Sequence, residues 1–155
     1  MTYLVRGLDP ASFQKLFAMT DDQLSAVRAK RVVADKAAGF PCRISLRDAE
    51  VGNRLILLNH VSVEEPSPFH ARHGIFVREH AQAPAPLHGR LPAMLDSRTI
   101  SLRGFDSEGM LRHAALALPG EGDCVVRALL DRPEIALVHA HNAAYGCYLA
   151  AVVRS

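Results

Sequence analysis

The sequence predicts an α+β fold with a mixed or largely antiparallel sheet, two N-terminal helices and one late helix. Helix-start signals occur near the N-terminus, a helical spacing of apolar residues occurs late in the chain, and strand-length apolar segments lie between them. The last segments read as hairpins. This order differs from the regular strand–helix alternation of a doubly wound fold. We expect residues 1–155 to form a single domain.

Two helix starts are visible near the N-terminus. Asp9 before Pro10 is typical of an N-cap followed by proline at the first helical position, and it predicts a short helix. Thr20 with Gln23 three residues later forms a capping box, which predicts a second helix ending near Lys30.

Strand signals fill the middle of the chain. Residues 55–58 are continuously apolar, which favours a central strand, and residues 75–77 begin another strand. Residues 80–92 contain three prolines at positions 84, 86 and 92, so we expect a surface loop long enough to act as a lid.

The C-terminal half predicts two hairpins and a helix. Residues 99–103 and 110–118 form the first hairpin around a turn at 106–109, and residues 121–131 form the helix. Residues 135–153 form the second hairpin around a polar loop.

Composition limits the functional classes. A chain of 155 residues with 49% hydrophobic and 22% charged residues is typical of a globular protein with a sizeable core. The net charge of +2 is too small to indicate a nucleic-acid partner. No segment approaches the ~20 apolar residues that span a bilayer, so we expect no membrane partner and a cytoplasmic location. Three widely spaced cysteines indicate neither a disulfide framework nor a cysteine-only zinc site.

Three separated segments, residues 39–50, 74–78 and 139–148, together resemble the bacterial domain-of-unknown-function 1203 family. The resemblance covers nearly the whole chain. It implies a bacterial cytoplasmic protein and, since the family has no assigned activity, it transfers no catalytic residue.

The second hairpin holds the candidate catalytic residues. Side chains alternate along a strand, so a five-residue loop over 142–146 places His141 opposite Cys147 and His139 opposite Leu149. An imidazole beside a thiol favours thiolate, which makes Cys147 a candidate nucleophile and His141 its base. Asn142 is a candidate to orient an imidazole or to donate to an oxyanion, and Gly146 to supply a left-handed residue.

Three alternatives remain open for this hairpin. The histidines and the cysteine are buried and satisfied in many strands, and a one-residue bulge would move Cys147 to the other face. His139, His141 and Cys147 also permit a zinc site, and His70 with His73 forms another candidate pair. We expect no metal and no cofactor.

Cys42 and Arg43 form a second candidate feature. A loop cysteine beside a guanidinium is a candidate for a reactive thiol, and Arg43 is a candidate to hold an anionic ligand. The alternative is an ion pair between Arg43 and Asp48 or Glu50. Cys124, in the late helix, is expected to pack in the core.

No nucleotide-binding, α/β-hydrolase or metalloprotease motif is present. The sequence therefore favours a small-molecule-binding domain, with an enzyme as one version of it, whose pocket takes an anionic ligand at the loop end of the last hairpin. The residues expected to line this pocket are His139, His141, Asn142 and Cys147, with Arg43 and Cys42 nearby. The alternative is a structural or interaction protein whose hairpin packs a homodimer.

Overall fold

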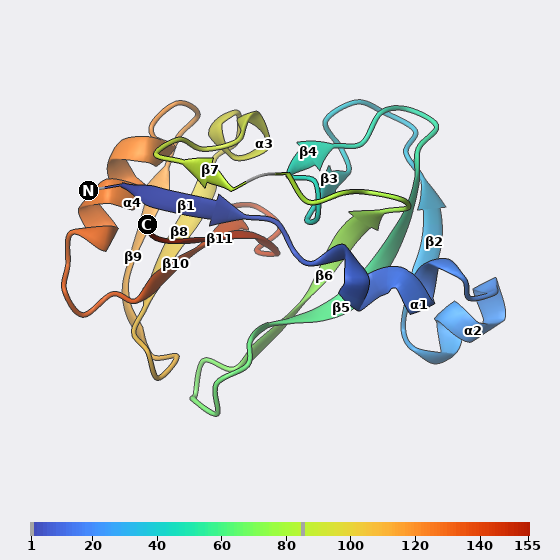
Figure 1. Cartoon of the computed structure of the whole chain (residues 1–155), viewed down its shortest axis with the longest axis horizontal. Helices are drawn as coiled ribbons and strands as arrows, with labels where there is room; N and C mark the ends of the chain where they lie inside the picture. The colour runs from blue at the N-terminus through green and yellow to red at the C-terminus, as the bar shows by residue number, and fades with distance from the viewer. Residues whose placement is uncertain (1, 85) are drawn as a thin grey trace.

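The computed structural model describes residues 2–84 and 86–155, which form one six-stranded and one five-stranded β-sheet with short helices beside them (Figure 1). The α+β class is confirmed. Pairing within the described residues is antiparallel except where β3 (Pro41–Cys42) runs parallel to β6 (Ala71–Arg78). The division of the strands into two sheets is not predicted by the sequence pattern.

The six-stranded sheet contains both predicted C-terminal hairpins. Its first hairpin is β8–β9, and its last, β10–β11, is interior because β11 also pairs with β1 and β10 with β8. The pairing of β1 with β11 brings the two ends of the chain close together (Figure 1). In spatial order the strands are β7 (Leu87–His88), β1 (Tyr3–Arg6), β11 (Tyr148–Arg154), β10 (Leu137–Asn142), β8 (Ile100–Phe105) and β9 (Leu111–Ala117).

The five-stranded sheet is built from the middle of the chain. The apolar run at residues 55–58 lies in an interior strand, as expected, whereas the strand over residues 75–77 begins earlier, at Ala71. The order is β2 (Lys30–Val33), β5 (Arg54–Val63), β6, β3 and β4 (Arg47–Asp48).

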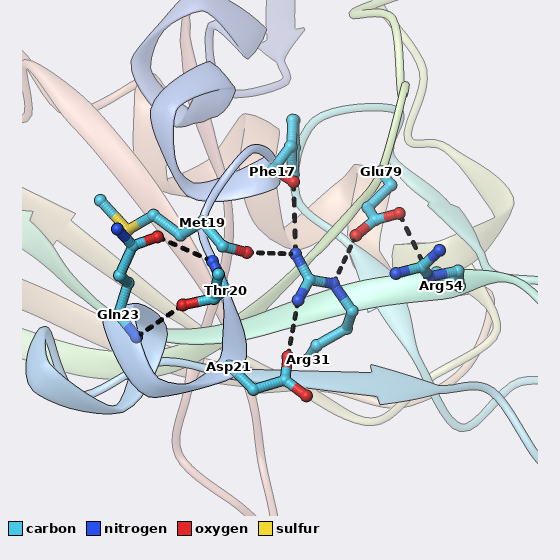
Figure 2. Close-up of polar contacts among 8 residues, drawn as sticks. All are labelled: Phe17, Met19, Thr20, Asp21, Gln23, Arg31, Arg54 and Glu79. Atoms are coloured by element: carbon cyan, nitrogen blue, oxygen red, sulfur yellow. Dashed lines mark hydrogen bonds and ion pairs between the residues drawn. The ribbon is translucent and has the colours of Figure 1, made fainter.

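The predicted N-terminal helices are present as η1 (Pro10–Phe13) with α1 (Gln14–Phe17), and α2 (Asp21–Ala26). The Thr20 hydroxyl accepts from the Gln23 backbone at 3.3 Å, and the Gln23 side chain accepts from the Thr20 backbone at 2.9 Å, which completes the capping box (Figure 2). α2 ends before Lys30 because Arg28 adopts a left-handed φ of 59°.

Arg31 fastens these helices to the five-stranded sheet (Figure 2). Its guanidinium lies 2.7 Å from the Asp21 carboxylate at the start of α2 and 2.8 Å from the Glu79 carboxylate beyond β6. It also donates to the backbone carbonyls of Phe17 and Met19. One side chain therefore satisfies the carbonyls where α1 ends and joins α2 to the sheet.

The late helix is present as α4 (Gly122–Leu130) and covers one face of the six-stranded sheet. Val126, Leu129 and Leu130 pack there against sheet residues that include Val138 and Ala140. A second core lies between the five-stranded sheet and the N-terminal helices, and it includes Tyr148 from β11 of the other sheet. Tyr148 thus ties the two sheets together.

Residues 80–92, expected to be a surface loop, contain β7, which pairs with β1, and lead into α3 (Ala93–Asp96). Ala85 in this segment lies outside the described residues. Among residues 2–84 and 86–155, no helix is long and apolar enough to cross a membrane.

Candidate functional site

The last hairpin closes on four loop residues rather than five. The Asn142 backbone donates to the Cys147 carbonyl at 2.9 Å, and the Asn142 side chain accepts from the backbones of Ala144 and Tyr145 at 3.0 and 2.9 Å. Gly146 takes the expected left-handed conformation, with φ of 74°. Because the Asn142 side chain organises a four-residue turn, the register differs by one residue from the symmetric closure.

The expected pairing of His141 with Cys147 is therefore wrong. His141 lies opposite Tyr148, and Ala140 lies opposite Ala150, so that Leu149 is an extra, bulged residue. His139 lies opposite Ala151 rather than Leu149. Asn142 takes the place beside Cys147 that the sequence assigned to His141.

This register divides the predicted site residues between two sides of the sheet. Asn142, Cys147 and Arg43 line one cavity, whereas His139 and His141 make ring contacts with Tyr148 on the opposite face of β11. No hydrogen bond within the described residues joins His141 to Cys147. The two groups of side chains therefore need separate descriptions.

The first cavity, which we call the inter-sheet cavity, has a volume of about 890 Å³ and is lined by residues of both sheets. Gly74 and Phe76 come from β6, Asn142 from β10, and Leu149 from β11. The loop over residues 35–41 forms another wall. This volume lies within the ~300–1,000 Å³ range of small-molecule sites.

Arg43 belongs to the wall of the inter-sheet cavity and is only 1% exposed. Its Nε donates to the Tyr148 carbonyl at 2.8 Å and its Nη1 to the Pro41 carbonyl at 2.6 Å. Its Nη2 donates to the Cys147 Sγ at 3.4 Å. Arg43 thus links the end of β3 to β11, and its positively charged guanidinium contacts the Cys147 sulfur, which lines the cavity.

The expected ion pair between Arg43 and Asp48 or Glu50 is absent from the described residues. Arg98 takes Asp48 instead, with two guanidinium–carboxylate bonds of 2.5 and 3.0 Å. Burial lowers the pKa of Arg43, although a guanidinium remains protonated at neutral pH. Arg43 is therefore a buried cation with no carboxylate beside it.

Arg98 also shapes the loop that borders the inter-sheet cavity. It donates to the Ala38 carbonyl at 2.9 Å, and Ala38 has a φ of 56°, which is strained for alanine. Leu46, in the segment that follows Arg43, has a φ of 55° while being fully buried. Of these two residues Ala38 lines the inter-sheet cavity and Leu46 does not, so the backbone strain that bears on this site is that of Ala38.

The second group of side chains is a cluster of four histidines around Tyr148. The His73 and His141 rings lie 4.9 Å apart, the His139 and Tyr148 rings 5.1 Å apart, and the His60 and Tyr148 rings 5.8 Å apart. His60 and His73 are directly paired on β5 and β6. The cluster therefore lies where the two sheets face each other.

Two nitrogen atoms of this cluster are buried and have no hydrogen-bond partner among the described residues. The His141 Nδ1 lies 3.0 Å from the Gly146 carbonyl and so carries the proton, which leaves Nε2 as a bare acceptor. The His139 Nδ1 is also buried and unpaired. Burial lowers the pKa of His139 to about 4 and that of His141 to about 3, so both rings are neutral at pH 7.

The zinc alternative finds no geometric support. Within residues 2–84 and 86–155, no group of three or more His, Cys, Asp or Glu side chains is placed to hold a metal ion. His70 and His73 line a small cavity beside His141, whereas Cys147 lies on the other side of the strand.

The other two cysteines lie away from both groups. Cys42 is fully buried in the second core, and its Sγ accepts from the Arg78 backbone at 3.2 Å. Cys124, expected in the core, is exposed on α4, with its Sγ donating to the Glu121 carbonyl at 3.0 Å. The structure therefore brings Arg43, Asn142 and Cys147 together, without Cys42.

Sequence reasoning missed Tyr148, His60 and Arg98 as site residues. The alternation of β11 places Tyr148 on the face of His141 once the four-residue turn is known, and Asn142 two residues before Ala144 is a visible signal for that turn. Nothing local marks Arg98, because its partner Asp48 is 50 residues away in the sequence.

Comparisons with known proteins agree with the resemblance seen in the three segments. No curated protein and no solved structure matches the chain. One family model, described as a protein of unknown function (DUF1203), matches residues 39–154, a span that includes the histidine cluster, every strand except β1 and β2, and the part of the inter-sheet cavity lining from Gly39 onward. The chain therefore belongs to the DUF1203 family.

Proposed function

We propose that the chain binds a small anionic molecule in the inter-sheet cavity. The observation that carries the proposal is Arg43, a buried guanidinium that has no carboxylate partner and that contacts the cavity lining through Cys147. A buried charge without a counter-charge is costly, and an anion in the cavity would supply that counter-charge.

The charges of the lining support an anion. Lys36, Arg43 and Arg98 line the cavity against one acid, Asp35. Arg98 is neutralised by Asp48, which leaves Lys36 and Arg43 against Asp35, an excess of one positive charge. Charges act over longer distances in such a partly enclosed site than in water, because the surrounding protein screens them less.

The remaining lining indicates the rest of the ligand. Phe40, Phe76 and Leu149 provide apolar surface for a hydrophobic body. The Asn142 side chain uses its oxygen in the turn, so its amide N–H groups remain available as donors in the cavity wall. We therefore expect a ligand with one anionic end and an aromatic or aliphatic body.

Cys147 gives the proposal its enzymatic version. The sulfur is half-buried in the cavity wall, and a thiolate there would be the counter-charge of Arg43. Cys147 is placed both to contact Arg43 and to meet a bound molecule. The catalytic assignment of Cys147 with His141 thus becomes a proposal for Cys147 with Arg43.

Calorimetric titration of the full chain tests the proposal, with benzoate and phenyl phosphate as anionic probes and benzamide as a neutral one. At least one anion should bind and benzamide should not. Lys36→Gln, an exposed change that leaves the core intact, should weaken anion binding severalfold, and Arg43→Gln should abolish it. Arg72→Gln, at an exposed position outside the cavity, is the matched control.

Two results would overturn the proposal. The first is equal binding of benzamide and the anions, or binding of none of them. The second is a homodimer that Cys147→Ala dissociates while no ligand changes the melting temperature, which the interaction alternative predicts. The hairpin strands are interior, so such a dimer would use the loop, where Tyr145 is 87% exposed.

A further inference from the structure

The histidine cluster borders a second cavity, of about 290 Å³, which we call the histidine cavity. His139 and Tyr148, 6% and 4% exposed, form its floor, and Glu64 and Glu65 form its rim. We infer that this cavity binds a small zwitterion, an aliphatic α-amino acid, with the carboxylate at the floor and the ammonium at the rim. The inference is independent of the function proposed for the inter-sheet cavity.

The floor of the histidine cavity consists of polar groups without partners. His139, Tyr148 and His60 make no hydrogen bond through their side chains to any described residue, although all three line the cavity. Buried polar groups in folded proteins are nearly always hydrogen-bonded. The His139 Nδ1 is such a buried atom without a partner, and the Tyr148 hydroxyl and the half-buried His60 ring line the cavity beside it without a protein partner, so the lining indicates a polar ligand rather than an apolar one.

Positive charge lies behind this floor. Arg103 is directly opposite His139 on β8, so the two side chains share a face, and Arg103 has no ion pair or hydrogen bond with the described residues. It lines an adjacent cavity that shares Val63 and Phe105 with the histidine cavity. Arg43 lies behind the same floor, because its Nε donates to the Tyr148 carbonyl.

Negative charge lies at the rim. Glu64 is exposed and Glu65 half-buried, and neither has an ion-pair partner among the described residues. The cavity therefore has carboxylates at its open end, and the charge nearest its buried end is the positive charge of Arg103 in the adjacent cavity. A zwitterion matches both ends, whereas an anion or a cation alone matches one of them.

The same geometry orients the ligand. The Tyr148 hydroxyl and a His139 N–H are the donors for the carboxylate, and the Arg103 guanidinium, in the adjacent cavity, adds positive charge from behind them. The ammonium group faces the Glu64 and Glu65 carboxylates. Phe105 and Leu137, also in the lining, contact an aliphatic side chain.

Calorimetric titration of the full chain tests the inference with L-alanine, L-valine and L-leucine as probes. For each amino acid, the amine that lacks the carboxylate and the carboxylate that lacks the ammonium are titrated in parallel. We expect one or more amino acids to bind at least about tenfold more tightly than either analogue, since each analogue lacks one of the two hydrogen-bonded charges.

Variants assign the two ends of the ligand. Arg103→Gln should remove the preference for the amino acid over its amine, and Glu64→Gln with Glu65→Gln should remove the preference over its carboxylate analogue. Tyr148→Phe should weaken binding about tenfold while keeping the ring in place. The rim changes are at the surface, so they remain informative if the Tyr148 variant fails to fold.

Binding of none of the amino acids, or equal binding of either analogue, would overturn the inference. Lys36→Gln is the control that separates the two cavities, because it should weaken anion binding in the inter-sheet cavity and leave amino-acid binding unchanged. Amino-acid binding that is lost in Lys36→Gln and retained in Arg103→Gln would place the ligand in the inter-sheet cavity and would equally overturn it.

Discussion

Acidification from pH 8 to pH 5 should destabilise the fold through its buried histidines. His139 and His141 are 6% and 1% exposed, and their pKa values are lowered, mainly by burial, from the ordinary 6.5 to about 4 and about 3. Between pH 6.5 and pH 4 the unfolded chain therefore binds protons at these two sites and the native chain does not. Stability is complete above pH 6.5 and is lost as the pH falls below it.

The magnitude follows from the lowered pKa values. At pH 5 each imidazole that stays neutral in the native state costs about 2 kcal/mol, the 1.5 pH units below 6.5 at about 1.4 kcal/mol per unit. The two sites together remove about 4 kcal/mol, a large part of a typical unfolding free energy of about 5–15 kcal/mol. Burial also lowers the pKa values of His60 and His73, which adds a loss of the same sign.

Urea unfolding followed by far-ultraviolet circular dichroism at pH 8, 7, 6 and 5 measures this loss. The variant His141→Asn keeps an N–H donor for the Gly146 carbonyl and removes one titrating group, so its loss should be smaller by about 2 kcal/mol. His70→Asn, at an exposed position, should behave as the wild type. An unfolding free energy that is constant from pH 7 to pH 5, or equal losses in all three proteins, would refute the reasoning.

Three further substitutions test other parts of the structure by urea unfolding. Arg31→Ala should cost about 1–3 kcal/mol because it leaves two carbonyls unpaired and leaves the Glu79 carboxylate with only the exposed Arg54 as a partner. Arg54→Ala, at that exposed end of the same network, should cost much less; equal costs would contradict the anchoring role. Ala38→Gly should stabilise the chain by up to about 1 kcal/mol because it relieves a positive φ, and a net loss would argue against strain there. Asn142→Ala should cost about 1–2 kcal/mol because the turn loses both side-chain acceptor bonds, and an unchanged stability would show that the turn forms without them.

Features set by neighbouring residues could be predicted from the sequence. The capping box of Thr20 and Gln23, the β8–β9 hairpin, the late helix and the left-handed Gly146 all depend on residues a few positions apart. The class of fold follows from these local signals. The division into two sheets does not, because it depends on pairings such as β1 with β11, which join opposite ends of the chain.

The candidate site was predicted in part, because one residue of register decided it. The sequence placed His141, Asn142 and Cys147 correctly at the loop end of a hairpin, but the side-chain acceptor of Asn142 shortens the loop and puts Tyr148 beside His141. The sequence also did not reveal that Arg43 lacks a carboxylate partner, for a different reason. Asp48 and Glu50 lie close enough to Arg43 in the sequence to form an ion pair with it. Only the tertiary structure shows that Asp48 forms its ion pair with Arg98 instead.

The alkylation rates of two cysteines in one chain test the central claim most directly, that positive charge from Arg43 acts in the inter-sheet cavity at Cys147. Iodoacetate is an anion and iodoacetamide is neutral, and exposed Cys124 serves as the internal control. The ratio of the iodoacetate rate to the iodoacetamide rate, measured by peptide mass spectrometry, should be about tenfold higher at Cys147 than at Cys124. In Arg43→Gln it should fall to the Cys124 value. An equal or lower ratio at Cys147 in the wild type would contradict the account.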